Sequence, residues 1–274
     1  MCRLFGCRTV TPGAVAHELL HGANALRIQS REHPDGWGLG WYVGRVPQVV
    51  RSLSAAHGDE DFEHVGSFVT ASTILAHLRK ASVGAVSLVN THPFEWGPWL
   101  FAHNGTISDW RLISPAVETR IDAGLRAKLR GETDSERCFY LFLTCLADRC
   151  DPTSATFAHA AAALDQAVGV IRSAARAAGQ PEPATTFLAT ALDGSEERFG
   201  GGRVHGIVID LLQEAGHRIH LRIAVGVVEL RHIQLIVDAP CLLVIRIGRA
   251  GGLPGVAMRS SNPSANSSAG PESR

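Results

Sequence analysis

The sequence lacks an excess of charge of either sign. Lysine plus arginine and aspartate plus glutamate both number 26, so the formal net charge is zero at neutral pH. Proteins that bind nucleic acids or anionic membrane surfaces usually carry a basic excess. We therefore expect no nucleic-acid partner and no membrane partner.

Long apolar runs are absent as well. No stretch approaches the roughly 20 apolar residues of a membrane-spanning helix, and the N-terminal segment lacks the apolar core of a signal peptide. The six cysteines form no CxxC pair and no zinc-finger spacing. Buried free thiols in a reducing compartment fit this pattern, so we expect a cytoplasmic location. We also expect no metal and no cofactor.

The 274 residues have room for one large domain or two small ones. Apolar periodicity predicts helices over residues 14–29, 135–146 and 155–178. Strands are expected over 36–43 and 48–53, joined by a turn at 44–47, and over 73–78, 99–103 and 185–192.

Aromatic residues are missing after Phe199. Apolar runs at 204–212, 219–230, 233–237 and 242–247 still permit strands, whereas 248–274 is rich in glycine, serine, proline and asparagine, which is typical of disorder. We therefore divide the chain into a main domain over 1–193, a divergent C-terminal segment over 194–247 with further strands as one interpretation, and a disordered tail over 248–274.

A cysteine directly follows the initiator methionine. Aminopeptidase action ahead of this small residue would leave Cys2 with both a thiol and a free α-amine. The α-amine has a reference pKa near 8, so it can take the thiol proton and later protonate a leaving amine. The alternative is an inert cysteine at an arbitrary position.

Further segments follow MCRLFG in a fixed order: HPDGWGLGWY (33–42), HLRKAS (77–82), NTHPF (90–94), FAHNGTI (101–107) and ETDSE (132–136). Together they resemble the glutaminase domain of the class II, Ntn-type glutamine amidotransferases over about residues 1–193. MCRLFG and DGWG look most like the stand-alone subfamily that includes the γ-glutamyl hydrolase of ergothioneine biosynthesis and the amidotransferase subunit that degrades glutathione. The resemblance implies an α+β fold, a four-layer αββα sandwich with two antiparallel sheets.

Two charged residues in these segments suit the head of a glutamine substrate. Arg79 can bind the α-carboxylate through two parallel hydrogen bonds from its planar guanidinium, an interaction that the neighbouring Lys80 could not form. Asp134 can accept the α-ammonium group. The alternatives are a surface arginine and a plain helix N-cap, a role open to Thr133 or Asp134.

Asn104-Gly105 follows a strand-like run, and this dipeptide commonly forms a hairpin turn. Such a turn would present the Asn104 amide and the Gly105 N–H to the oxyanion of a tetrahedral intermediate. A turn without a catalytic role is the alternative.

Two further residues are expected to shape the site. His92 could act as a general base, but the α-amine makes a second base unnecessary, so we expect a structural histidine in the substrate pocket. Trp37 and the glycines around it are expected to line or close the site.

The resemblance implies attack by Cys2 on a γ-glutamyl amide and hydrolysis of the resulting thioester. The substrate is either glutamine, with ammonia passed to a trans-acting synthase subunit, or a γ-glutamyl conjugate of a larger molecule. A degenerate, non-catalytic binding domain is the alternative from another class, because residues after about Gly194 do not match the family pattern.

Overall fold

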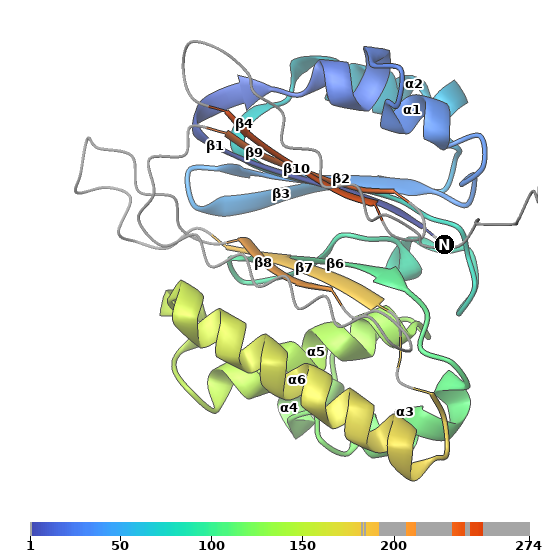
Figure 1. Cartoon of the computed structure of the whole chain (residues 1–274), viewed down its shortest axis with the longest axis vertical. Coiled ribbons are helices and arrows are strands. Elements are labelled where there is room, and N and C mark those ends of the chain that lie inside the picture. Colours follow the sequence, from blue (N-terminus) through green and yellow to red (C-terminus); the bar gives the residue numbers. More distant parts are fainter. Residues whose placement is uncertain are drawn as a thin grey trace, which may run out of the picture.

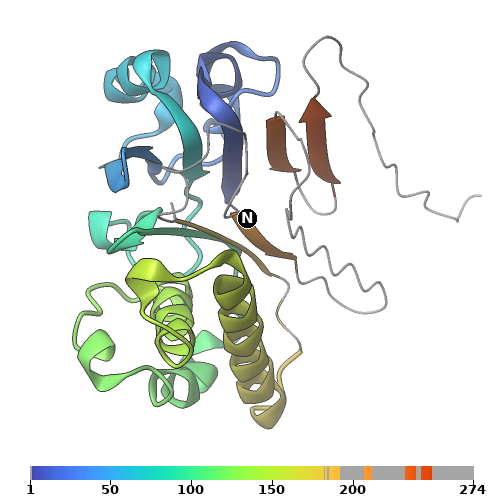
Figure 2. The same cartoon turned by 90° about the vertical axis from the view of Figure 1, so that its left-hand side faces the viewer.

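A computed structural model of the chain describes residues 2–181, 183, 185–191, 207–211, 232–238 and 242–248. Two antiparallel sheets face each other, and helices cover the outer face of each (Figure 1 and Figure 2). Each sheet thereby buries one face against the other sheet and its second face against helices. This arrangement confirms the αββα sandwich that the sequence predicts.

The first sheet consists of β1 (Arg3–Ala14), β2 (Trp37–Val43), β3 (Val46–Ser52), β4 (Thr70–Leu78), β9 (His232–Asp238) and β10 (Leu242–Gly248). Its strand order is β10-β9-β1-β4-β2-β3. The N-terminal strand β1 therefore lies inside the sheet, antiparallel to β4 on one side and to β9 on the other.

The second sheet consists of β5 (Phe94–Trp96), β6 (Trp99–Gly105), β7 (Thr185–Thr190) and β8 (Ile207–Leu211), in that order. The predicted strands at 73–78, 99–103 and 185–192 correspond to β4, β6 and β7 and are confirmed. Strands β8 and β9 lie within the C-terminal segment 194–247, and β10 extends one residue beyond it, to Gly248. The run 219–230 and the tail after Gly248 lie outside the described residues.

Short helical segments cover the first sheet: η1 (His17–His21), α1 (Leu26–Gln29), η2 (Ala56–Gly58) and α2 (Glu60–Phe68). The second sheet is covered by longer helices (Figure 1): α3 (Trp110–Glu118), α4 (Ala123–Arg126), α5 (Asp134–Ala147) and α6 (Phe157–Ala177). Two single turns, η3 (Leu88–Asn90) and η4 (Pro152–Ser154), lie in connections. The predicted helices at 135–146 and 155–178 are confirmed as α5 and α6. No helix in the described part of the chain is long and apolar enough to cross a membrane.

The prediction of one continuous helix over residues 14–29 is wrong. β1 runs to Ala14, a π-helical turn follows, and α1 begins only at Leu26. Gly22 ends the π-helical turn in an extended conformation, with φ −64° and ψ 155°. Glycine is poorly held in a helix because its backbone loses the most conformational freedom.

The predicted hairpin is confirmed, with a shorter turn than expected. β2 and β3 pair from Trp37↔Ser52 to Val43↔Val46, which leaves Gly44 and Arg45 as the loop. Gly44 has φ +58°, the left-handed backbone that a two-residue hairpin turn needs. Pro47, assigned to the turn from sequence, lies in the edge strand β3, where its missing N–H is tolerated.

Each sheet has its own apolar core toward its helices. On the first sheet, Trp37 packs edge-on against Phe62 of α2, with ring centroids 5.0 Å apart. On the second, Phe101 stacks on Phe139 of α5 at 5.1 Å and lies 5.7 Å from Phe187 of β7. Aromatic pairs at these separations add to the free energy of area burial.

Between the two sheets, glycines of β2 allow a close approach. A Cβ built at Gly38 would lie 1.9 Å from the carbonyl oxygen of His92. One at Gly40 would lie 2.9 Å from Leu100. At the far end of β2 the Tyr42 hydroxyl donates to the Thr190 carbonyl at 2.7 Å, which joins the first sheet to the second.

Candidate active site

Cys2 lies just before β1, next to the segment that follows β4. Its Sγ is 3.4 Å from the Lys80 N–H and 3.6 Å from the Lys80 carbonyl oxygen. The side chain is half-buried. Burial raises the pKa of the Cys2 thiol, while the charge of Arg79 acts to lower it and that of Asp134 to raise it. Arg3 of β1 pairs with Leu78 of β4, which places Cys2 beside Arg79 and Lys80.

Arg79 is the residue after β4 and is only 3% exposed. Its guanidinium donates to three backbone carbonyls of the following loop: Ala85 at 2.9 Å, Val83 at 3.2 Å and Gly84 at 3.3 Å. It has no ion-pair partner among the described residues. Burial lowers the pKa of Arg79, and the charges of Cys2, Asp35 and Glu132 act in the opposite direction.

Asp134 opens α5, and its carboxylate is 3% exposed. Oδ2 accepts from the Ile107 N–H at 2.9 Å, and Oδ1 accepts from the Ser135 N–H at 2.9 Å. The N-cap is Thr133, whose hydroxyl accepts from the Glu136 N–H. Asp134 is therefore not needed as the cap of α5, and it ties this helix to the chain just after β6.

Asn104 and Gly105 are the last residues of β6 and pair with Thr186 and Thr185 of β7. They do not form the predicted hairpin turn, because the chain continues into α3 and not into a neighbouring strand. The Asn104 side chain is 9% exposed, and its buried Oδ1 has no hydrogen-bond partner among the described residues. The fold therefore leaves this amide oxygen unsatisfied.

Hydrogen bonds connect the sequence segments around Cys2. The Ser82 hydroxyl is 2.8 Å from the Thr106 hydroxyl, which joins the loop after β4 to the loop after β6. Asp35 accepts from the Ala81 N–H at 2.8 Å, which adds the loop before β2. Segments far apart in sequence are in this way fixed around the start of β1.

Asn90 is a further organising residue, to which the sequence alone assigns no role. It is fully buried, and its Nδ2 donates to the Ala85 carbonyl at 3.0 Å and to Glu132 at 3.1 Å. Its Oδ1 accepts from the Glu132 N–H at 3.0 Å. A Cβ at Gly131 would lie 2.1 Å from that oxygen. The position of Asn90 within the NTHPF segment is the signal that could have identified it.

His92 belongs to a group of three buried histidines. Its ring centroid is 4.2 Å from that of His77 on β4 and 4.6 Å from Phe94. His103 of β6 completes the group, and its Nδ1 is 2.8 Å from the Ser135 hydroxyl. Burial lowers the pKa of His77 to about 3 and also lowers the pKa values of His92 and His103. A neutral ring of such low basicity suits a structural role, which for His92 stays a prediction.

Trp37 is not among the residues that the structure brings together around Cys2 and His92. The indole is fully buried in the outer core of the first sheet and donates from Nε1 to Asp59 at 2.8 Å. Its neighbour Gly38 is the residue that meets His92. Alternation along β2 explains the difference, because successive side chains point to opposite faces of a sheet.

The segment HELLH at residues 17–21 has the HExxH spacing of zinc sites, which the expectation of no metal overlooked. It forms the π-helical turn η1, where Leu19 and Leu20 are buried. The described residues contain no group of three or more histidine, cysteine, aspartate or glutamate side chains that could hold a metal ion. Two histidines alone fall short of the three protein ligands of a catalytic zinc site.

Comparison with known proteins identifies the family. The family model described as class-II glutamine amidotransferases matches residues 1–176. The chain belongs to the class II glutamine amidotransferases. The match contains every residue that we place around Cys2.

Two relatives illustrate the extent of the similarity. The γ-glutamyl-hercynylcysteine sulfoxide hydrolase of Mycobacterium tuberculosis (strain CDC 1551) is 35% identical over 138 residues, which are 46% of this chain and 59% of that protein. YafJ of Escherichia coli (strain K12), which is named as a glutamine amidotransferase, is 29% identical over 175 residues, or 61% of this chain and 65% of YafJ. The matches thus span less than two thirds of either relative.

A solved structure supports the fold of this amidotransferase. The glutamine aminotransferase class-II domain protein of Silicibacter pomeroyi superposes with a TM-score of 0.51, covering 69% of this chain and 73% of that one. The sequences are 21% identical, so the likeness concerns the fold alone.

Proposed function

We propose that this amidotransferase hydrolyses a γ-glutamyl amide, with Cys2 as the nucleophile after removal of Met1. The observation that carries the proposal is the convergence of the family segments on one thiol. Cys2 contacts the backbone of Lys80, and the charges of Arg79 and Asp134 both act on it. Asn104 lies at the end of β6, whose following loop is bonded to both the Arg79 loop and Asp134.

The first step requires a base near the thiol. Because burial raises the pKa of Cys2, the thiol is protonated at neutral pH. The α-amine exposed by loss of Met1 accepts this proton as sulfur attacks the γ-carbonyl carbon. It then returns the proton to the leaving nitrogen as the C–N bond breaks, which leaves a γ-glutamyl thioester. Water, deprotonated by the same amine, attacks the thioester and releases glutamate and the free thiol.

Arg79 supplies the cation for the substrate α-carboxylate. A guanidinium that is 3% exposed and has only carbonyl partners keeps its full positive charge in a poorly solvated place. A carboxylate brought beside it would be strongly favoured for that reason. The bonds to the loop carbonyls hold the guanidinium plane in a fixed direction.

Asp134 supplies the anion for the substrate α-ammonium group. It is buried and accepts hydrogen bonds only from neutral donors, so its negative charge has no cationic partner among the described residues. Together Arg79 and Asp134 match the two opposite charges of an amino-acid head group.

Asn104 and Gly105 stabilise the oxyanion of the tetrahedral intermediate. The Asn104 side chain makes no hydrogen bond to a described residue, so its amide donor is not consumed by the fold. Gly105 has φ +154°, a backbone conformation that favours glycine. Preorganised donors of this kind act on the transition state more than on the substrate.

The leaving group distinguishes the two versions of this reaction. The mycobacterial relative is named as a hydrolase of a γ-glutamyl conjugate. By analogy we propose that the substrate is a γ-glutamyl conjugate. We prefer this version to one in which glutamine is the substrate and ammonia is delivered to a synthase subunit. Comparing the kcat/KM for glutamine with that for a bulky γ-glutamyl amide tests this choice, and a clear preference for glutamine would favour the synthase partner.

The test of the nucleophile combines mass and labelling. Intact mass of the active protein should show loss of Met1, and 6-diazo-5-oxo-norleucine should label Cys2 with stoichiometry one. Cys2→Ala should abolish glutamate release. Cys7→Ala is the matched control, because the Cys7 thiol is buried in β1, the strand that follows Cys2, and burial raises its pKa to about 12. Full activity of protein that retains Met1 would contradict the mechanism.

A further inference from the structure

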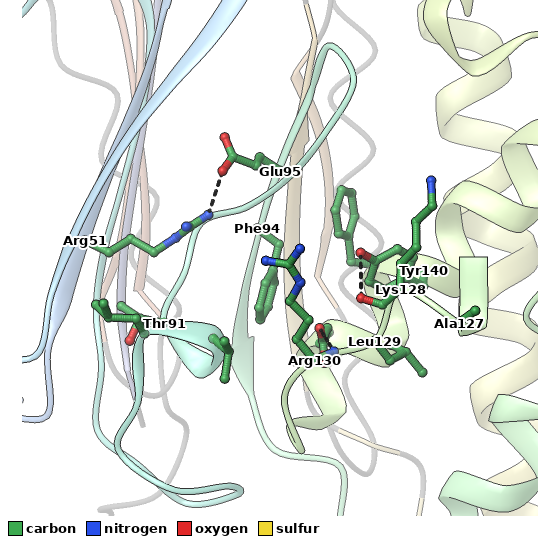
Figure 3. Close-up of a pocket in the computed structure, with 13 residues that line it drawn as sticks. Arg51, Thr91, Phe94, Glu95, Ala127, Lys128, Leu129, Arg130 and Tyr140 are labelled. Carbon is green, nitrogen blue, oxygen red and sulfur yellow. Dashed lines mark hydrogen bonds and ion pairs between the residues drawn. The ribbon is translucent and has the colours of Figure 1, made fainter. Parts of the chain in front are cut away.

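A pocket lies at the edge of the sandwich where β3 of the first sheet faces β5 of the second (Figure 3). Its volume is about 630 Å³, within the range of small-molecule sites. One wall comes from Arg51, Thr91 and Phe94, and the other from the segment after α4 and from α5. None of the residues that we place around Cys2 lines it, so it is a separate site.

Both acidic side chains of this pocket already have cationic partners within the protein. Glu136 accepts from the backbone N–H groups of Arg130 and Gly131, both at 2.9 Å, and pairs at 3.2 Å with Arg137, which also pairs with Glu118 at 3.0 Å. Glu95 pairs with Arg51 at 3.6 Å, the interaction drawn in Figure 3. Neither carboxylate is left to attract a cationic ligand.

Two cations of the pocket are not neutralised. Lys128 and Arg130 are exposed and have no ion pair with a described residue. The Lys128 Nζ lies 5.9 Å from the centroid of the Trp96 ring. Arg130 lines the pocket together with Tyr140 and Glu136. Burial and the charge of Glu136 raise the pKa of Tyr140, and the charge of Arg130 acts to lower it. The pocket is therefore electropositive.

Apolar groups form much of the remaining wall. Phe94 and Phe139 are buried with ring centroids 6.4 Å apart in a stacked orientation. Leu88 and Val89 are 52% and 42% exposed, although large apolar side chains gain free energy from being covered. An occupant with a flat apolar body would cover them.

We propose that this pocket binds a small organic anion, a carboxylate or phosphate carried on a planar aromatic body. Lys128 and Arg130 would contact the anionic group, and Leu88, Val89 and Phe94 the ring. The occupant would contact both of the segments that the Asn90 side chain joins. Val89 and Thr91, which flank Asn90, line one side of the pocket, and the segment between α4 and Glu132 lines the other.

Calorimetric titration with 2-naphthoate tests the proposal on the full chain, with neutral 2-naphthamide as the shape control. We expect saturable binding of one naphthoate per chain and at least tenfold weaker binding of naphthamide. Lys128→Gln combined with Arg130→Gln should weaken naphthoate binding at least tenfold. Arg126→Gln is the matched control, because Arg126 is an exposed cation of the same segment outside the pocket lining, and it should change nothing.

Protein whose Cys2 has been blocked with 6-diazo-5-oxo-norleucine separates this pocket from the proposed active site. Blocked protein should bind naphthoate as tightly as unblocked protein. Absence of saturable binding, equal binding by the double variant, or loss of binding on blocking would each overturn the proposal. Thermal unfolding of the variants checks that they are folded.

Discussion

Arg79 and Asn104 belong to different stages of the proposed reaction, and single substitutions should separate them. Arg79→Lys keeps the charge but loses the planar fork, so KM should rise with a smaller change in kcat. Asn104→Ala removes a donor to the oxyanion, so kcat should fall about 100- to 1000-fold with KM little changed. Steady-state kinetics of glutamate release measures both.

The control for these kinetics is Arg27→Lys. Arg27 pairs with Glu63 at 3.0 Å on the partly exposed surface of the first helical layer, so its replacement should leave both constants unchanged. Equal KM effects from Arg79→Lys and Asn104→Ala would show that their roles have been assigned wrongly.

The buried histidines should make stability depend on pH. Burial lowers the folded-state pKa of His77 to about 3, whereas an unfolded histidine titrates near pH 6.5. Below about pH 6.5 the unfolded chain therefore binds a proton that the folded chain does not. Stability should be complete above that pH, and His77 should lower it by about 1.4 kcal/mol per pH unit down to about pH 3. The lowered pKa values of His92 and His103 act in the same direction.

Urea unfolding between pH 7 and pH 4 measures this slope. His77→Leu should flatten it by the contribution of one histidine, whereas replacement of the exposed His64 by asparagine should not alter it. An unchanged slope in His77→Leu would mean that the folded protein accommodates the charged ring.

At the scale of single elements, replacing a glycine by alanine should have opposite effects on stability in β2 and in α6. Gly38→Ala places a Cβ 1.9 Å from the His92 carbonyl oxygen, so backbone must move, and we expect a loss of at least about 2 kcal/mol in the free energy of unfolding. Gly169 lies on the exposed side of α6 with nothing within 4 Å of its Cβ position. Gly169→Ala should instead stabilise the protein by about 1 kcal/mol. Chemical denaturation of both variants provides the measurement.

Sequence patterns predict elements well where one local signal dominates. The glycine turn between β2 and β3 and the apolar periodicity of α5 and α6 were sufficient. The helix over 14–29 was wrong because apolar spacing continues across Gly22, where the backbone is extended. Helices α2 and α3 were not predicted, although Asp59 caps α2 and Trp110, Ile113 and Val117 recur at helical spacing in α3.

The candidate site also contains residues that a local sequence pattern predicts and residues that it does not. Motif order predicts Cys2, Arg79, Asn104 and Asp134 as site residues, because each lies in a segment with a recognisable pattern. It does not identify Asn90, whose importance comes from bonds to the distant Glu132 and the loop carbonyl of Ala85. Trp37 was placed at the site by proximity in sequence, but alternation along β2 turns it toward the helices.

At the scale of the whole molecule, Tyr42 is a connection between the two halves of the sandwich. Its hydroxyl lies 2.7 Å from the Thr190 carbonyl and 3.0 Å from the Thr190 hydroxyl. Tyr42→Phe leaves these buried acceptors with one partner fewer, and we expect a loss of about 1 to 2 kcal/mol in the free energy of unfolding. Urea titration of the two proteins at pH 7 checks it, and unchanged stability would show that the contact contributes little to holding the sheets together.

The central position of β1 affects how the protein is made. β1 is synthesised before both of its neighbours, β4 and β9, and β9 begins only at His232. Translation at about 5 to 20 residues per second separates the synthesis of β1 and β9 by roughly 10 to 50 s. During that interval the edge of β1 that pairs with β9 has no partner strand. A nascent chain therefore contains every residue that we place around Cys2, up to Asp134, before the sheet that includes β1 is complete.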